Sequence, residues 1–159
     1  MDRVLTQRHH PDYLKVIQIR SLITHAALFV LTIIYLFLAS YKGWTLYPGW
    51  ISAGLFAGTG FLFTSLFPKL SYRWFAFDVF DEELEIRTGF IFIRNTLVPM
   101  VRVQHVELES GPLLRAFGLA EVSVVTAATT HRIVGLTREN AEELKQRIGT
   151  LAKVADDDE

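Results

Sequence analysis

Two long stretches without a charged side chain constrain this chain more than any other feature. Residues 21–41 and residues 48–67 contain no Asp, Glu, Lys or Arg. About 20 apolar residues in a helix suffice to cross the roughly 30 Å hydrocarbon core of a bilayer. Eleven residues of the first stretch and eight of the second are Leu, Ile, Val or Phe. Both stretches are therefore predicted to be transmembrane helices that form a hairpin, residues 21–67.

The second stretch is the less apolar of the two, and its small residues suggest how it is stabilised. The small residues predicted to pack against another helix are Gly49, Ala53, Gly54, Ala57 and Gly58. Glycine and alanine let two helices approach closely, and Gly54 with Gly58 forms a GxxxG pattern. Only six residues connect the two stretches, so the first helix is the nearest partner. We expect packing within the hairpin, with dimerisation as the alternative.

The basic residues beside the two stretches predict their orientation. Those outside the hairpin are Arg3, Arg8, Lys15, Arg20, Lys69 and Arg73, whereas Lys42 alone lies between the two stretches. Because Lys and Arg are retained on the cytoplasmic side, both termini are expected in the cytoplasm, with the protein in the inner (cytoplasmic) membrane. A cleaved signal peptide is disfavoured, since the charged leader is long and a second apolar stretch follows.

The leader, residues 1–20, is predicted to be cytoplasmic, with a helix that starts after Pro11 and Asp12 and continues into the membrane. His9 and His10 resemble a metal-binding pair. Adjacent residues point to different faces of a regular element, however, and no carboxylate or thiolate completes a ligand set. We therefore interpret the two histidines as a solvated pair.

The pattern after Pro68 changes to short β-branched and aromatic runs separated by turns, which predicts an antiparallel sheet in residues 68–155. The strands are expected at 70–80, 84–88, 90–98, 101–109, 121–127 and 131–134, with a short helix at 112–117 closed by Gly118. Thr137 is expected to cap a final amphipathic helix. Its apolar stripe is Ala141, Leu144, Ile148, Leu151 and Ala155. The acidic tail, residues 156–159, is expected to be disordered.

Strands followed by one amphipathic helix are the element order of a pleckstrin-homology fold. The segment VPMVRVQHVELESGPLLRAFGLA, from Val98 to Ala120, makes the likeness specific. It resembles the bacterial pleckstrin-homology-like membrane proteins of the YdbS-like family, and the preceding hairpin resembles that family's layout too. The resemblance implies an α+β membrane protein: a two-helix transmembrane hairpin, then a pleckstrin-homology-like antiparallel sheet or barrel capped by a C-terminal helix. It implies a membrane-tethered module and no particular reaction.

The composition argues against several classes of function. Sixteen Lys and Arg balance 17 Asp and Glu, so no basic surface for nucleic acid is expected. The absence of cysteine removes thiolate catalysis and thiolate metal sites. The polar residues considered for a catalytic site are Asp78, His105, Glu107, Glu109 and His131. An exposed strand face explains the alternation around His105, so we expect no enzyme, no metal and no cofactor.

Phosphoinositide binding is the obvious hypothesis for this fold, yet the loop after the first strand reads Asp81-Glu82-Glu83 and would repel an anionic headgroup. The scattered arginines that could contact an anion or a partner are Arg87, Arg94, Arg102, Arg115 and Arg132. The favoured hypothesis is a scaffold that binds a related membrane protein, or itself, with a role in envelope homeostasis or defence against membrane-active agents. The alternative is a domain that senses anionic lipid.

Overall fold

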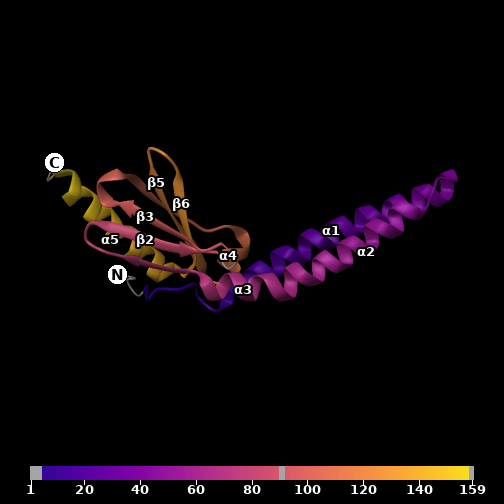
Figure 1. Cartoon of the computed structure of the whole chain (residues 1–159), viewed down its shortest axis with the longest axis horizontal. Helices are drawn as coiled ribbons and strands as arrows, with labels where there is room; N and C mark the ends of the chain where they lie inside the picture. The colour runs from indigo at the N-terminus through magenta and orange to yellow at the C-terminus, as the bar shows by residue number, and fades with distance from the viewer. Residues whose placement is uncertain (1–4, 90–91, 158–159) are drawn as a thin grey trace. The chain divides into compact units, whose positions relative to one another are not determined.

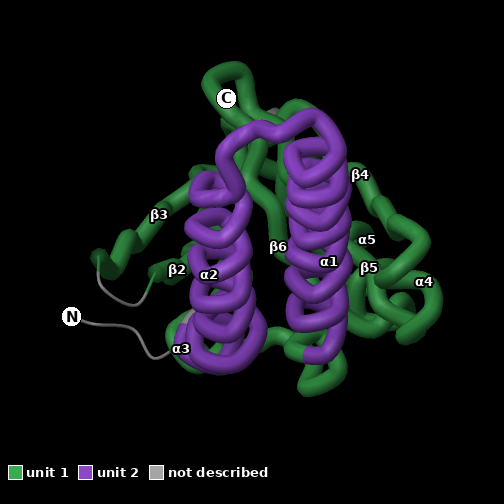
Figure 2. Tube along the Cα trace, turned by 90° about the vertical axis from the view of Figure 1, so that its right-hand side faces the viewer, with its two compact units in different colours: residues 1–14, 71–159 green, residues 15–70 purple. Residues whose placement is uncertain are grey.

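The computed structural model describes residues 5–89 and 92–157. Residues 156 and 157 belong to the C-terminal helix, so the expected disorder of the acidic tail is wrong for these two residues. Residues 158–159 of that tail and the predicted strand start at residues 90–91 lie outside the described residues. The chain forms two compact units (Figure 2). One comprises Met1–Leu14 and Ser71–Glu159, and the other is Lys15–Leu70. The first unit is therefore assembled from two segments that are far apart in the sequence.

The second unit is the apolar hairpin. Its first helix, α1, runs over Asp12–Lys42, and a second continuous helix is made of α2 (Tyr47–Phe61), a π-helical turn η1 (Leu62–Leu66) and α3 (Phe67–Trp74). The two helices lie side by side (Figures 1 and 2). Both are long and apolar enough to cross a membrane. Only 11% of the most apolar window of α1 and none of that of the second helix is buried, so these side chains do not form a protein core.

The contact between the two helices lies at Gly49 and Gly60. A Cβ atom at Gly49 would stand 2.7 Å from Cγ of Leu36, and one at Gly60 would stand 3.2 Å from the His25 ring. Polar contacts accompany these close approaches. Thr64 donates a hydrogen bond of 3.2 Å to Ser21, and Ser52 donates one of 3.5 Å to Thr32.

The GxxxG face does not take part in this contact. A Cβ atom at Gly54 or at Gly58 would meet no other atom within 4 Å. Ala57 is likewise exposed, whereas Ala53 is half-buried. The hairpin therefore packs through a face that begins at Gly49, and the expectation that Gly54 and Gly58 contact the first helix is corrected. Packing of Gly54 and Gly58 against a further helix stays a prediction.

The second helix runs further than expected, because residues 70–74 were predicted to begin a strand and are helical. The N–H of Phe67 bonds to the carbonyl of Leu62, five residues back, which defines the π-helical turn. Pro68 follows directly and has no N–H to donate. The helix nonetheless continues through Pro68, which directly follows the π-helical turn, to Trp74.

The first unit contains two antiparallel three-stranded sheets, ordered β1-β2-β3 and β4-β5-β6. The strands are β1 (Ala76–Val79), β2 (Glu83–Thr88), β3 (Arg94–Pro99), β4 (Val103–Glu109), β5 (Leu119–Thr126) and β6 (Thr130–Thr137). A 3₁₀ turn, η2 (Met100–Arg102), joins β3 to β4, so the predicted fourth strand begins two residues late. A short helix, α4 (Pro112–Ala116), precedes β5 as expected, with Gly118 in the left-handed region at φ +65°.

The two sheets share one hydrophobic core, which the C-terminal helix α5 (Arg138–Asp157) completes. The side chains of Phe77 from the first sheet and Ile133 from the second are fully buried. From the predicted stripe of α5, Ala141, Leu144 and Ile148 are buried in this core. Thr137 accepts a 3.3 Å hydrogen bond from the N–H of Asn140, as expected of a helix cap. The unit thus has the predicted α+β architecture.

The residues before α1 also belong to this unit, which the sequence analysis did not predict. We call residues 5–11 the N-terminal arm. Gln7 pairs with Phe77 of β1 through two backbone hydrogen bonds, and the N–H of His10 bonds to the carbonyl of Gly135 in β6 at 2.7 Å. The predicted leader, residues 1–20, is therefore divided. Its arm completes the sheet domain, and its helix begins at Asp12 as expected.

Candidate functional site

The unpaired strand edges of the two sheets are candidate binding sites. Two three-stranded sheets have four edge strands, namely β1, β3, β4 and β6. The N-terminal arm lies against β1 at Phe77 and against β6 at Val134 and Gly135. Within residues 5–89 and 92–157, β4 pairs on one side only, with β5. An unpaired edge presents backbone donors and acceptors that another strand can use.

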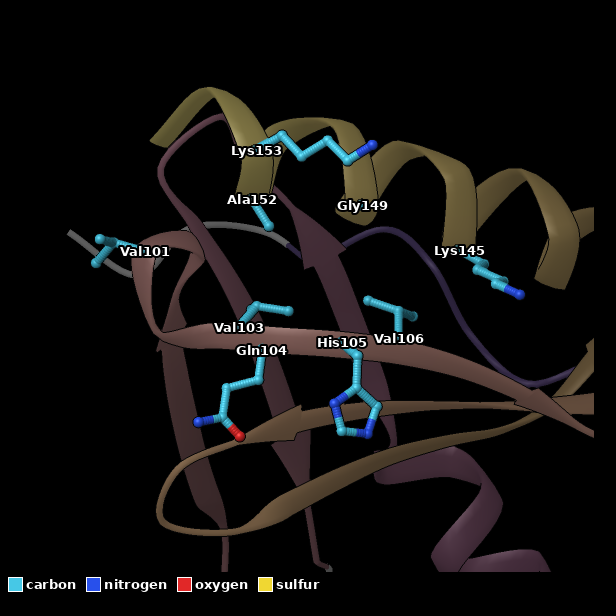
Figure 3. Close-up of a pocket in the computed structure, with 9 residues that line it drawn as sticks. All are labelled: Val101, Val103, Gln104, His105, Val106, Lys145, Gly149, Ala152 and Lys153. Carbon is cyan, nitrogen blue, oxygen red and sulfur yellow. The ribbon is translucent and has the colours of Figure 1, made fainter. Parts of the chain in front are cut away.

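A groove of about 700 Å³ lies beside this edge, between β4 and α5. We call it the β4–α5 groove. It is lined by Val101, Val103, Gln104, His105, Val106, Lys145, Gly149, Ala152 and Lys153. Figure 3 shows Val103 and Val106 pointing towards α5, whereas Gln104 and His105 point away from the helix. The floor of the groove is therefore apolar.

One face of α5 forms the opposite wall. Lys145, Gly149, Ala152 and Lys153 recur at helical spacing, beside the stripe that is buried in the core. A Cβ atom at Gly149 would meet nothing within 4 Å, so the middle of this wall is open. This wall was not predicted from the sequence, although the spacing of two lysines around one glycine was an available signal.

The polar residues considered for catalysis do not converge. His105 and Glu107 lie 3.4 Å apart on the exposed face of β4. Asp78 instead holds the N-terminal arm, since its Oδ2 accepts hydrogen bonds from the hydroxyl and the N–H of Thr6 at 2.7 and 3.2 Å. In the part of the chain that the structure describes, no group of three or more His, Cys, Asp or Glu residues is placed to hold a metal ion.

His9 is half-buried and packed against the sheet domain, so the interpretation of His9 and His10 as a solvated pair is wrong for His9. Its ring stacks on Phe75 with centroids 3.7 Å apart, and its Nδ1 lies against the carbonyl oxygen of Val134. A carbonyl can only accept, so Nδ1 carries the proton. Burial lowers the pKa of His9 to about 4, against the smaller opposing effect of the Val134 carbonyl. His9 thus holds the arm in place as a neutral group.

A second hollow of about 510 Å³ adjoins the groove and shares Val101 and Gln104 with it. It lies between η2 and the turn that joins β5 to β6. The side chains of Leu97 and Val101 are 54% and 40% exposed here. Together the two hollows make a partly apolar surface around η2, of the kind that marks protein-binding sites.

The five candidate arginines lie on five different elements. They are Arg87 on β2, Arg94 on β3, Arg102 in η2, Arg115 on α4 and Arg132 on β6. Arg132 is 3.4 Å from Glu121, and Arg87 donates to Asn95 at 3.0 Å. Arg87 and Arg94 are one register position apart on paired strands, so they project from opposite faces of the sheet. Arg102 lines the second hollow.

The turn between β1 and β2 is acidic, as the sequence predicts. Asp81 and Glu82 are exposed there, and the N–H of Phe80 bonds to the carbonyl of Glu83 at 2.9 Å. This turn presents carboxylates, which an anionic headgroup does not favour.

Comparison with known proteins identifies the family. A family model described as "Bacterial PH domain" matches residues 17–152. The chain is 38% identical over 153 residues to the UPF0699 transmembrane protein YdbS of Bacillus subtilis (strain 168), a match that covers 93% of each chain. No solved structure matches. These matches confirm the resemblance and the fold class that the sequence indicated. The chain belongs to the YdbS-like family of bacterial PH-domain membrane proteins.

Proposed function

We propose that this protein is a non-enzymatic scaffold that binds another protein at the membrane. The observation that carries the proposal is the apolar surface around η2, where Leu97 and Val101 are exposed beside the unpaired edge of β4. Exposed apolar side chains next to a free strand edge favour protein contacts. The polar residues on the same domain are paired with one another or spread over separate elements.

The proposal includes a topology in which both long helices span the membrane and both termini are cytoplasmic. Its support is the apolar, unburied character of the two helices and the excess of basic residues outside the hairpin. The chain has no cysteine, so labelling of a single introduced cysteine reports on which side of the membrane that residue lies. Thr45→Cys, in the connection, is expected to react with an impermeant maleimide on intact cells, and Asp81→Cys is not. Labelling of Asp81→Cys from outside would contradict this topology.

The partner we propose is a related membrane protein or a second copy of this chain. A photoactivatable crosslinker at Leu97, introduced in the full-length protein at native expression, tests this in the cell's own membrane. Recovery of one defined protein adduct is the expected result. A crosslinker at Glu139, exposed at the start of α5, provides the matched control. Equal yields from both positions, or adducts with lipid alone, would argue against the scaffold.

The alternative function, sensing of anionic lipid through the arginines, has less support because these side chains lie on separate elements. Nanodiscs with and without anionic lipid separate the two functions. A sensor would show amide exchange that changes around Arg94 and Arg102 only with anionic lipid, and Arg102→Gln would abolish the change. The scaffold predicts no such difference.

We further propose a role in envelope homeostasis or in defence against membrane-active agents. The support is a PH-like domain tethered to the membrane, in which the described residues include no group of three or more His, Cys, Asp or Glu placed to hold a metal ion. A deletion strain is expected to show altered sensitivity to membrane-active peptides, restored by the intact gene. Unchanged sensitivity across such agents would remove this role and leave the scaffold proposal standing.

A further inference from the structure

We propose that the β4–α5 groove binds an extended segment of a partner protein, which adds to β4 as a strand and places acidic side chains against Lys145 and Lys153. This inference rests on the scaffold function proposed above and names the chemistry that the scaffold recognises. It depends on three features of the groove, which are its free strand edge, its apolar floor and its charge.

The strand edge is the first feature. The N-terminal arm lies against β1 and β6, so the chain itself supplies cover at those two edges. No described residue pairs with β4 from the groove side. The register of β4 against β5 shifts between Val103 and His105 and is regular from His105 to Glu109. His105 and Val106 of that regular segment line the groove and offer main-chain groups to an incoming strand, and the irregularity limits where the strand can align.

The apolar floor is the second feature. Val103 and Val106 point into the groove from β4, and Ala152 faces them from α5 (Figure 3). The open space at Gly149 leaves room for a side chain of the incoming strand. Because alternate residues of a strand share one face, the segment would place an apolar side chain there and point its neighbours away.

The charge is the third feature. Lys145 and Lys153 are exposed, and neither has an ion pair among the described residues. The two lysines are eight positions apart in the helix, a distance of about 12 Å along the axis. Four strand residues span about 13 Å, so acidic residues at positions i and i+4 match the two lysines, with the apolar residue at i+2 between them. Glu107 and Glu109 alternate in phase with His105, which points away from α5 (Figure 3), so they do not oppose this charge.

The test is direct binding of a labelled peptide to the purified full-length protein in detergent micelles. The probe is a fluorescent ten-residue peptide with the core Glu-Thr-Val-Thr-Glu. Fluorescence anisotropy is expected to show saturable binding that weakens as salt is raised, because screening reduces the attraction between exposed charges. The peptide with lysine in place of both glutamates is expected not to bind.

Three variants locate the site. Gly149→Leu fills the open wall and is expected to weaken binding by roughly tenfold or more, as is Lys145→Glu combined with Lys153→Glu. Thr150→Leu, at an exposed position of α5 that does not line the groove, is the matched control and is expected to bind as the wild type does. Circular dichroism confirms that each variant is folded. Binding unchanged by Gly149→Leu and by the double charge reversal would overturn the proposal.

The crosslinking experiment keeps this inference distinct from the scaffold function. If the Leu97 crosslinker captures a partner while the acidic peptide does not bind, the scaffold stands and the acidic-strand proposal fails. If the peptide binds in the groove but the crosslinker captures no protein, the groove stands and the membrane-protein partner fails.

Discussion

The imidazole ring of His9 stacks on the phenyl ring of Phe75, with ring centroids 3.7 Å apart and planes inclined by 15°. The two residues are separated by the entire apolar hairpin in the sequence. Tyr72 strengthens the contact, since its hydroxyl donates a 3.0 Å hydrogen bond to the carbonyl of His9. The sheet domain is therefore closed by the segment that precedes the first apolar helix, and a fragment that starts at Pro68 would lack it.

His9→Ala is expected to destabilise the sheet domain by about 2 kcal/mol, because it removes a half-buried ring stacked on Phe75 and leaves the Val134 carbonyl without its donor. Amide exchange in β1 and β6 should accelerate, since the N-terminal arm lies on these strands. His10→Ala is the control, because the His10 side chain is 38% exposed and its effect should stay below about 1 kcal/mol. Equal effects of both substitutions would contradict this account of the arm.

Acid should release the arm. The pKa of His9 is lowered from 6.5 to about 4 because burial disfavours its charged form. Below pH 6.5 the undocked arm takes up a proton that the docked arm does not, so docking weakens as pH falls and loses roughly 3 kcal/mol by pH 4. Above pH 7 the contribution is constant. Limited proteolysis of the arm should therefore accelerate between pH 6.5 and 4, and His9→Phe should reduce that acceleration.

Local composition and periodicity account for the parts of the fold that the sequence predicts well. The absence of charged residues over stretches of 21 and 20 residues identifies the two apolar helices. A helix can cross a bilayer if it is long enough and apolar enough, so length and composition are sufficient for this prediction. The spacing of Ala141, Leu144 and Ile148 likewise identifies the buried face of α5. Both signals are local in the sequence, so they can be recognised without knowledge of the tertiary structure.

The features that the sequence does not reveal depend on long-range contacts. His9 and Val134 are 125 residues apart, and nothing in the sequence near His9 distinguishes a packed, half-buried ring from a solvated one. The alternation of apolar residues after Pro68 favours a strand, but continuation of the preceding helix overrides this local preference up to Trp74. The β4–α5 groove is also non-local, because its two walls come from separate elements.

Ser123→Ala is expected to stabilise the sheet domain by up to about 1 kcal/mol. Ser123 is 2% exposed, and within the described residues its hydroxyl has no hydrogen-bond partner, so the substitution removes an unsatisfied buried group. Thermal unfolding of the full-length protein in one detergent measures the change. Ser110→Ala is the matched control, because that hydroxyl donates to the carbonyl of Leu119 at 2.8 Å and its loss should destabilise by about 1 kcal/mol. Destabilisation of similar size in both variants would contradict the distinction between an unsatisfied hydroxyl at Ser123 and a hydrogen-bonded one at Ser110.

Gly49→Val should disrupt the helix hairpin, and Gly54→Val should not. A side chain at residue 49 would overlap Leu36 on the facing helix, whereas residue 54 has open space around its Cα. Overpacking of this kind costs about 1–3 kcal/mol. Two labels, one on each helix, report the hairpin by energy transfer in lipid nanodiscs, and transfer should fall for Gly49→Val alone. If Gly54→Val instead lowers the recovery of crosslinked dimers while leaving the transfer intact, the GxxxG face contacts a second copy. Reduced transfer in Gly54→Val would place the hairpin contact on the face where the sequence first suggested it.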